Sequence, residues 1–245
     1  MAIISWNKKY TETLAVTVKR FRTEHPEYAR SKITYAGRLD PMAEGLVILL
    51  TDDDVHQKKQ YLALDKIYEV DFFYGVSTDT YDVLGVVIEK DDFKPIINME
   101  KIIEYLQSQS TQSFPPYSSQ PVLGKPMWQW AREGTLPKDI PEKSIKIHHI
   151  SYITKKLIPF EELHRYIQQS VSQVEGNFRQ EEIIDSWNHF FAKQSQAMIE
   201  IYSLRIHASS GTYMRSLVNL VGEYLDCGAT TLKIRRIKVG DKVLT

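Results

Sequence analysis

The first regular hydrophobic pattern along the chain is that of an amphipathic helix. Between residues 11 and 23, Leu14, Val18 and Phe21 recur at spacings of four and three, which places them on one helical face. Lysine and arginine occupy part of the remaining surface of this segment. The pattern predicts a helix with one buried face and one basic face.

Four further segments have the patterns of β-strands. Residues 45–50 form a continuous apolar run, which is typical of a buried strand. Residues 66–76 and 198–207 alternate apolar and polar side chains, as half-buried strands do. In residues 232–239 basic side chains are interleaved with isoleucine, so we expect basic and apolar groups to lie on opposite faces.

Helical patterns appear in other parts of the chain. Residues 98–109 begin with an asparagine that can cap a helix, residues 127–133 end before a glycine, and residues 211–225 repeat apolar side chains at helical spacing. The proline-rich segment 114–119 cannot continue the first of these helices, because proline lacks an amide donor. Helices and strands in this irregular order predict an α+β fold rather than a doubly wound sheet.

A stretch rich in charged and amide side chains runs from about residue 137 to residue 195. Two parts of it, 161–173 and 180–193, have helical patterns. We therefore expect one domain over residues 1–245 with a mostly helical insert at 137–195.

The charge of the chain is balanced overall but unevenly distributed. The 31 basic residues equal the 31 acidic ones, which argues against binding of nucleic acid by bulk charge alone. Residues 1–40 and 205–245 each carry a net charge of +4, and the middle carries −8. If the two ends fold together, their basic side chains can form a surface for a phosphate backbone. Uneven charge also arises without any such function.

Cysteine content and hydropathy exclude several classes of protein. The single cysteine, Cys227, cannot form an intramolecular disulfide, and no second cysteine supports a zinc cluster, so we expect no metal. No apolar run approaches the roughly 18 residues of a membrane-spanning helix, and no signal peptide is recognisable. The sequence predicts a cytoplasmic protein without membrane contact.

The most informative polar residue is Asp40. It precedes a proline, lies between Gly37 and Gly45, and comes just before the predicted buried strand. A carboxylate in such a turn is held on a rigid scaffold, which suits a nucleophile or a base. An Asp-Pro pair is also common in ordinary turns, and on its own this segment leaves that interpretation open.

Several segments together resemble the TruB-type family of tRNA pseudouridine-55 synthases. The segment from Tyr35 to Gly45 resembles the family's Gly-x-x-Gly-x-Leu-Asp-Pro-x-Ala-x-Gly motif. The other matching blocks follow in the family's order: Asp65-Lys-Ile-Tyr-Glu-Val70, Gly75 to Gly85, Pro115 to Gly134, and Ser210-Gly-Thr-Tyr-Met-Arg215 with Gly222 to Arg236. Ordered blocks over about 200 residues are far more specific than any one motif.

The resemblance implies an RNA isomerase and a role for each matching residue. Asp40 corresponds to the catalytic aspartate, which attacks the target uridine or removes a proton, and Arg215 pairs with it. Tyr68 is expected to stack on the flipped base, while Tyr213 and Ile234 line the uracil pocket. A nearby guanidinium favours the ionised form of a carboxylate, and a flipped base needs an aromatic platform.

The resemblance also implies a fold and a substrate. We expect a central, mainly antiparallel mixed sheet flanked by helices, with the active cleft across it. The substrate is expected to be the T-arm of tRNA or another stem-loop RNA, bound by a monomer. Isomerisation adds no atom and changes no redox state, so no cofactor is implied.

Three departures from the family concern RNA contacts. Tyr35 replaces a histidine that contacts the RNA, and we expect it to supply a stacking face. His56 stands where many members have a lysine. The chain continues only briefly after Gly240, so we expect no separate C-terminal RNA-binding (PUA) domain.

Two other functions are compatible with the same residues. An RNA-binding or RNA-folding factor could keep the fold and lose turnover, and the altered contact positions favour it. A hydrolase that pairs Asp40 with Asp79 or Asp82 would need the two carboxylates at a defined separation.

Overall fold

A computed structural model describes residues 2–88, 98–194 and 197–244 of the chain. Within these residues, eight strands form one sheet in the order β1-β3-β13-β4-β12-β11, with β2 paired to β3 and β14 to β13. The strands of this sheet are β1 (Ala2–Lys8), β2 (Ile33–Ala36), β3 (Ala43–Thr51), β4 (Lys66–Tyr74), β11 (Ile147–Pro159), β12 (Met198–Ala208), β13 (Ala229–Val239) and β14 (Lys242–Val243).

The sheet is mainly antiparallel and mixed, as predicted. Its one parallel pair among the described strands joins β13 to β3, where Ile234 lies opposite Ala43. Three small two-stranded sheets lie outside it: β5 (Ser77–Thr78) with β6 (Val87–Ile88), β7 (Thr111–Ser113) with β10 (Glu142–Ser144), and β8 (Pro121–Val122) with β9 (Lys125–Pro126). The α+β prediction is therefore confirmed.

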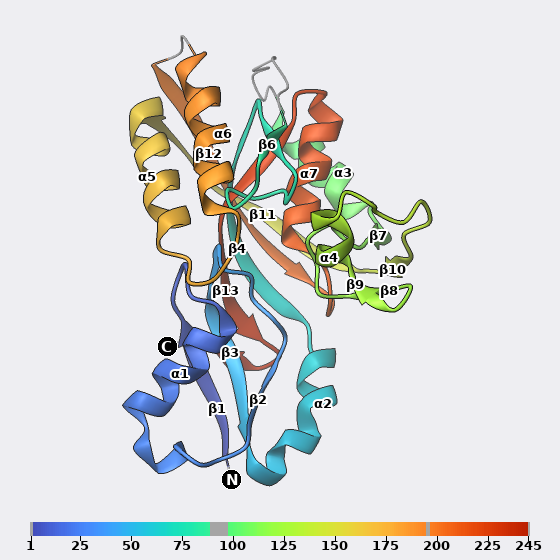
Figure 1. The fold of residues 1–245 in the computed structure, drawn as a ribbon. Helices are drawn as coiled ribbons and strands as arrows, with labels where there is room; N and C mark the ends of the chain where they lie inside the picture. Colours follow the sequence, from blue (N-terminus) through green and yellow to red (C-terminus); the bar gives the residue numbers. More distant parts are fainter. Residues whose placement is uncertain (1, 89–97, 195–196, 245) are drawn as a thin grey trace.

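Helices cover both faces of the sheet (Figure 1). They are α1 (Leu14–Glu24), α2 (Lys58–Ala63), α3 (Met99–Gln107), α4 (Met127–Arg132), α5 (Phe160–Ser172), α6 (Gln180–Ala192) and α7 (Met214–Leu225). Helices α1, α3 and α7 pack in one core with Phe72, whereas α5 and α6 pack in a second core with Phe73. Successive side chains of a strand point to opposite faces, so these two cores lie on opposite sides of β4.

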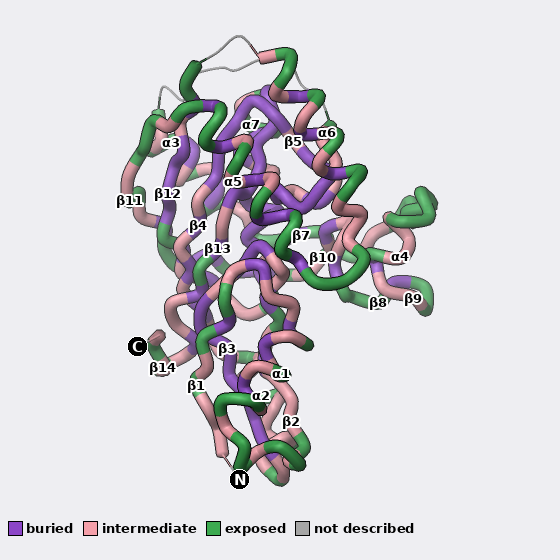
Figure 2. The backbone as a smooth tube through the Cα atoms, turned by 60° about the vertical axis from the view of Figure 1, so that its left-hand side comes forward, coloured by how far each residue is buried: buried purple, intermediate pink, exposed green. Residues whose placement is uncertain are grey.

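Burial follows the predicted patterns closely (Figure 2). Strand β3 is almost entirely buried, and β4 alternates over its first half. The predicted cap of α3 is present, because the Asn98 side chain accepts a hydrogen bond from the amide of Lys101 at 3.1 Å. The part of the chain that contains α4, β8 and β9 projects to one side of the sheet in both views.

The expected helical insert at 137–195 differs from the prediction in its first half. Residues 147–159 form strand β11, which pairs with β12 as an edge strand of the main sheet. Only α5 and α6 are helical in this range, and residue 195 lies outside the described residues. Most side chains of β11 are exposed because the edge strand has little covering it, and its pattern is therefore not that of a buried strand.

None of the helices in the described segments has both the length and the apolar character that crossing a membrane requires.

Candidate active site

Asp40 lies in the turn between β2 and β3. Its carbonyl accepts a hydrogen bond from the amide of Ala43 at 3.0 Å, and the carbonyl of Pro41 accepts one from the amide of Thr11 at 2.9 Å. The side chain of Asp40 is 43% exposed, so its carboxylate can be reached from solvent. The turn is thus fixed by its backbone while the acid stays accessible.

Two buried cations hold the backbone around this turn. The ammonium of Lys8 donates to the carbonyls of Ala43 and Lys9, and burial lowers the pKa of Lys8 to about 8. The guanidinium of Arg236 donates to the carbonyls of Leu46 at 2.7 Å, Gly37 at 3.1 Å and Arg38 at 3.3 Å. The expectation that all basic groups of 232–239 face away from the core is therefore wrong for Arg236, which is 1% exposed. Its charge is compensated by peptide carbonyls that belong to a distant part of the chain.

Gly45 permits the close approach of β3 and β13. Its φ is +104°, and a Cβ atom there would lie 2.3 Å from the carbonyl oxygen of Arg236. Any other residue would therefore collide with the backbone of β13. The second glycine of the Asp40 motif is explained by this contact, which brings Ile234 next to the start of β3.

Arg215 lies between two carboxylates. Its Nε is 2.9 Å from Oδ2 of Asp40 and 3.6 Å from Oδ2 of Asp82. Burial raises the pKa of Asp82 to about 6, although the charge of Arg215 opposes this shift. Burial acts to lower the pKa of Arg215, but Asp40 and Asp82 outweigh it and raise that pKa. The guanidinium is therefore permanently charged and oriented toward Asp40.

The remaining donors of Arg215 bind two loops. Its Nη1 donates to the carbonyl of Thr80, and its Nη2 donates to the carbonyl of Tyr117 at 3.3 Å. Asp82 is in turn held by the hydroxyl of Thr80 at 2.8 Å and the amide of Leu84 at 3.0 Å. The carbonyls of Thr80 and Tyr117 and the carboxylate of Asp40 together fix the orientation of the guanidinium.

A hollow of about 470 Å³ opens beside this ion pair. All six site residues chosen from the sequence line it: Tyr35, Asp40, Tyr68, Tyr213, Arg215 and Ile234. Tyr68 and Ile234 are 8% and 5% exposed, and burial raises the pKa of Tyr213. The backbone of Tyr213 is fixed by Gln112, whose side chain accepts from its amide at 2.7 Å and donates to its carbonyl at 3.1 Å.

Tyr35 lies at a basic edge of the same hollow. The Arg38 guanidinium is 5.9 Å and the Lys58 ammonium is 5.4 Å from the centre of its ring. Lys66 also lines the hollow, and burial lowers its pKa to about 8. An aromatic face surrounded by cations suits an exposed nucleobase with its phosphate.

The arrangement disfavours a pair of carboxylates acting together in hydrolysis. Asp82 and Asp40 share one guanidinium, and Asp79 forms an ion pair with Arg179 at 2.8 Å. Asp79 lines neither this hollow nor a second one, of about 430 Å³, that also adjoins Asp40. Sequence reasoning missed Lys8, Arg236 and the structural role of Asp82, because nothing local in the sequence marks a charged side chain as buried.

One group of side chains in the described chain has the geometry to hold a metal ion. Asp65, His148 and His207 offer ligand atoms that all lie within 4.8 Å of one another. The sequence did not reveal this group, because His148 lies in β11, His207 lies in β12 and Asp65 directly precedes β4. Its members already interact, since His148 is 2.9 Å from Asp65 and its ring centre is 4.6 Å from that of His207. None of the three lines the hollows beside Asp40.

Comparisons with known sequences cover most of the chain. The model of the TruB family pseudouridylate synthase (N-terminal domain) matches residues 25–214. A tRNA pseudouridine synthase B of Blochmanniella floridana is 34% identical over 219 residues, covering 88% of this chain and 68% of that protein. The protein of the same name from Wigglesworthia glossinidia brevipalpis is 28% identical, covering 86% of this chain and 52% of that protein. The chain thus spans roughly half to two thirds of these curated relatives.

Comparisons with solved structures agree on the fold. A chain of a Cbf5–Nop10–Gar1 complex has a TM-score of 0.54 at 13% identity, covering 98% of this chain and 50% of that one. A chain of an H/ACA ribonucleoprotein bound to a substrate RNA has a TM-score of 0.51 at 14% identity, covering 97% of this chain and 47% of that one. At these identities the likeness concerns the fold alone.

Proposed function

This chain belongs to the TruB family of pseudouridylate synthases, and from that premise we propose that it converts one uridine in the T-loop of tRNA to pseudouridine. Asp40 is the catalytic carboxylate in this proposal. The curated relatives named tRNA pseudouridine synthase B support the reaction, which is an isomerisation. The observation that carries the assignment of Asp40 is its 2.9 Å ion pair with buried Arg215 at the wall of a hollow of about 470 Å³.

The reaction breaks the bond from N1 of uracil to C1′ of ribose and forms a bond from C5 to C1′. The proton lost from C5 is balanced by a proton gained at N1, so substrate and product have the same composition. An ionised carboxylate at Asp40 can attack the nucleotide or remove a proton during the rearrangement. The detached base must turn in place, which requires a pocket that holds it without a covalent link.

The hollow provides the surfaces that such a base needs. Tyr68 offers an aromatic platform, Ile234 an apolar wall, and Tyr213 a polar hydroxyl, while Asp40 stands at the sugar side. Flipped bases are held by stacking between aromatic and apolar side chains. Arg215 supports this by holding the carboxylate in one orientation with a charge-assisted hydrogen bond.

The RNA strand around the flipped nucleotide is proposed to follow the basic edge of the hollow. Tyr35 takes the stacking role there, and Arg38 and Lys58 beside its ring face the phosphates. A stem-loop such as the T-arm presents unpaired bases that this edge can accept. We propose that a monomer suffices, because all six site residues come from one chain.

The test is to map pseudouridine at nucleotide resolution after incubating unmodified tRNA transcript with the wild type and with Asp40→Asn. Asp185→Asn, which changes an exposed aspartate on α6, is the matched control. We expect product at the T-loop uridine with the wild type and the control, and none with Asp40→Asn, which should still bind RNA.

Product at another uridine would contradict the proposed T-loop target but would support the proposed reaction. Product from Asp40→Asn at the wild-type rate would contradict the role of the carboxylate. RNA binding without product in any variant would support an RNA-binding factor that has lost turnover.

A further inference from the structure

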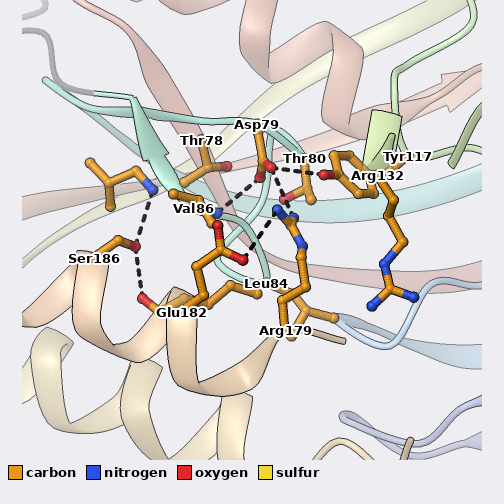
Figure 3. Close-up of polar contacts among 12 residues, drawn as sticks. Thr78, Asp79, Thr80, Leu84, Val86, Tyr117, Arg132, Arg179, Glu182 and Ser186 are labelled. Carbon is orange, nitrogen blue, oxygen red and sulfur yellow. Dashed lines mark hydrogen bonds and ion pairs between the residues drawn. The ribbon is translucent and has the colours of Figure 1, made fainter. Parts of the chain in front are cut away.

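Helices α5 and α6 form a hairpin that is attached to the segment 77–88 beside the active site (Figure 3). The amide of Val87 donates to the hydroxyl of Ser186 at 3.2 Å, and the indole of Trp187 donates to the carbonyl of Val83 at 3.2 Å. Trp187 is fully buried in the core that α5 and α6 share with this segment. The hairpin therefore packs against the loop that contains Thr80 and Asp82 and stabilises its position.

The loop at the tip of the hairpin ends with an arginine. Arg179 precedes α6 with a φ of +63°, a left-handed conformation that costs conformational energy in any residue but glycine. Its Nη2 is 2.8 Å from Oδ2 of Asp79, and its guanidinium lies 4.7 Å from the centre of the Tyr117 ring. The strained backbone is thus compensated by an ion pair and a stacking contact.

Asp79 and Tyr117 are also joined to each other. The Tyr117 hydroxyl donates to Oδ2 of Asp79 at 3.0 Å, and the amide of Val86 donates to Oδ1 at 2.9 Å. Burial, together with the charge of Asp79, raises the pKa of Tyr117 to about 12, so the hydroxyl keeps its proton. Arg179 completes a closed set of contacts that links the hairpin tip with two separate loops.

These two loops are the ones that hold the catalytic ion pair. Arg215 donates to the carbonyls of Thr80, the neighbour of Asp79, and of Tyr117. The tip also forms one wall of a second hollow of about 430 Å³, which shares Asp40 and Arg215 with the first. The ion pair of Arg179 with Asp79 therefore adjoins the groups that hold Arg215. An isolated ion pair on the surface would lack these contacts and would contribute little to stability.

We propose that Arg179 is a positioning residue, which acts through Asp79 and Tyr117 to keep Arg215 aligned with Asp40. The inference rests on the proposed function of Asp40, and it assigns the α5–α6 hairpin a part in the reaction. Displacement of the two loops would turn the guanidinium away from the carboxylate without altering the uracil hollow itself.

The test compares Arg179→Ala with Arg165→Ala, which removes an exposed arginine from α5 of the same hairpin. With saturating tRNA under single-turnover conditions, we expect the rate of Arg179→Ala to fall roughly 5- to 30-fold. Its affinity for tRNA should change less than about twofold, because the rest of the RNA surface is intact. Arg165→Ala should match the wild type in both, and thermal melts establish that each variant is folded.

Two further measurements separate positioning from other roles. Asp79→Asn alone, and the double variant that combines Asp79→Asn with Arg179→Ala, should each lose as much rate as Arg179→Ala alone, since the two residues act as one unit. Tyr117→Phe, which keeps the carbonyl that Arg215 uses, should show a smaller loss of the same kind. Independent losses that multiply in the double variant would overturn the proposal.

An NMR readout works without turnover. The Arg215 Nε–H signal, identified by its absence in Arg215→Lys, should be sharp in the wild type and Arg165→Ala and broadened in Arg179→Ala. A sharp signal in Arg179→Ala, or lost tRNA affinity with an unchanged rate, would overturn the inference. If the wild type forms no pseudouridine, the proposed function fails and the NMR comparison still decides the role of Arg179.

Discussion

Replacing Arg215 by methionine is expected to destabilise the fold by about 3–5 kcal/mol at pH 7.5, because it leaves Asp82 buried without its counter-charge. Asp82 is 4% exposed and Arg215 is 3% exposed, so water cannot replace the lost partner. Asp40 also loses a partner, but its side chain is 43% exposed and contributes less.

The pKa of Asp82 determines how this loss depends on pH. Burial raises that pKa from 3.8 to about 6 in the folded wild type. Because the folded state holds this proton more tightly than the unfolded state, the contribution of Asp82 to stability is fully present below pH 3.8. It is lost as the pH rises through 6. The contribution amounts to about 3 kcal/mol. Without Arg215 the folded pKa is higher still, and stability continues to fall from pH 6 to 7.5 by up to about 2 kcal/mol. The cost of Arg215→Met therefore grows across this pH range.

The assay is urea unfolding at pH 5 and pH 7.5, followed by tryptophan fluorescence, to which buried Trp187 contributes. The double variant Arg215→Met with Asp82→Asn should regain about 2 kcal/mol relative to Arg215→Met, because no buried charge remains. Arg205→Met, which breaks an exposed ion pair with Glu69, should cost less than about 1 kcal/mol. Additive losses in the double variant, or a cost that is equal at the two pH values, would refute this reasoning.

Two other predictions concern the close approach of strands and the base platform. Gly45→Ala should cost at least about 2 kcal/mol in urea unfolding, because its Cβ would meet the backbone of β13, whereas Gly134→Ala has open space and should cost only about 1 kcal/mol. A cost for Gly45→Ala no larger than for Gly134→Ala would contradict the packing argument. Tyr68→Leu should lower the single-turnover rate at saturating tRNA roughly 5- to 150-fold, because it removes the aromatic stacking face. Tyr68→Phe keeps that face and should keep the wild-type rate. Equal rates for leucine and phenylalanine would exclude stacking.

Much of the sheet could be predicted because its strands have simple periodic patterns. Residues 66–76 alternate because one face of β4 is buried while Glu69 and Asp71 on the other face stay half-exposed. Residues 45–50 are continuously apolar because β3 is covered on both faces. Strand β11 escaped prediction because an edge strand exposes most of its side chains, so its pattern carries little information.

The site was predictable where residues form contiguous motifs and unpredictable where contacts are distant in sequence. The motif around Asp40 identified the turn, but the carbonyls that neutralise Lys8 and Arg236 belong to other segments. A buried cation looks the same in a sequence as an exposed one. The contact between Arg179 and Asp79, 100 positions apart, likewise requires the fold.

The central strands of the sheet cannot all pair until the last part of the chain has been synthesised. Strand β4 pairs with β12 and β13, both of which leave the ribosome more than 120 residues after it. At usual rates of translation, both edges of β4 wait for partners on the order of ten seconds. The nascent chain must shield these edges during that interval, since unpaired strands promote aggregation. The hollow beside Asp40 is completed only when Ile234 arrives beside Ala43, so an unfinished chain lacks one wall of the proposed active site.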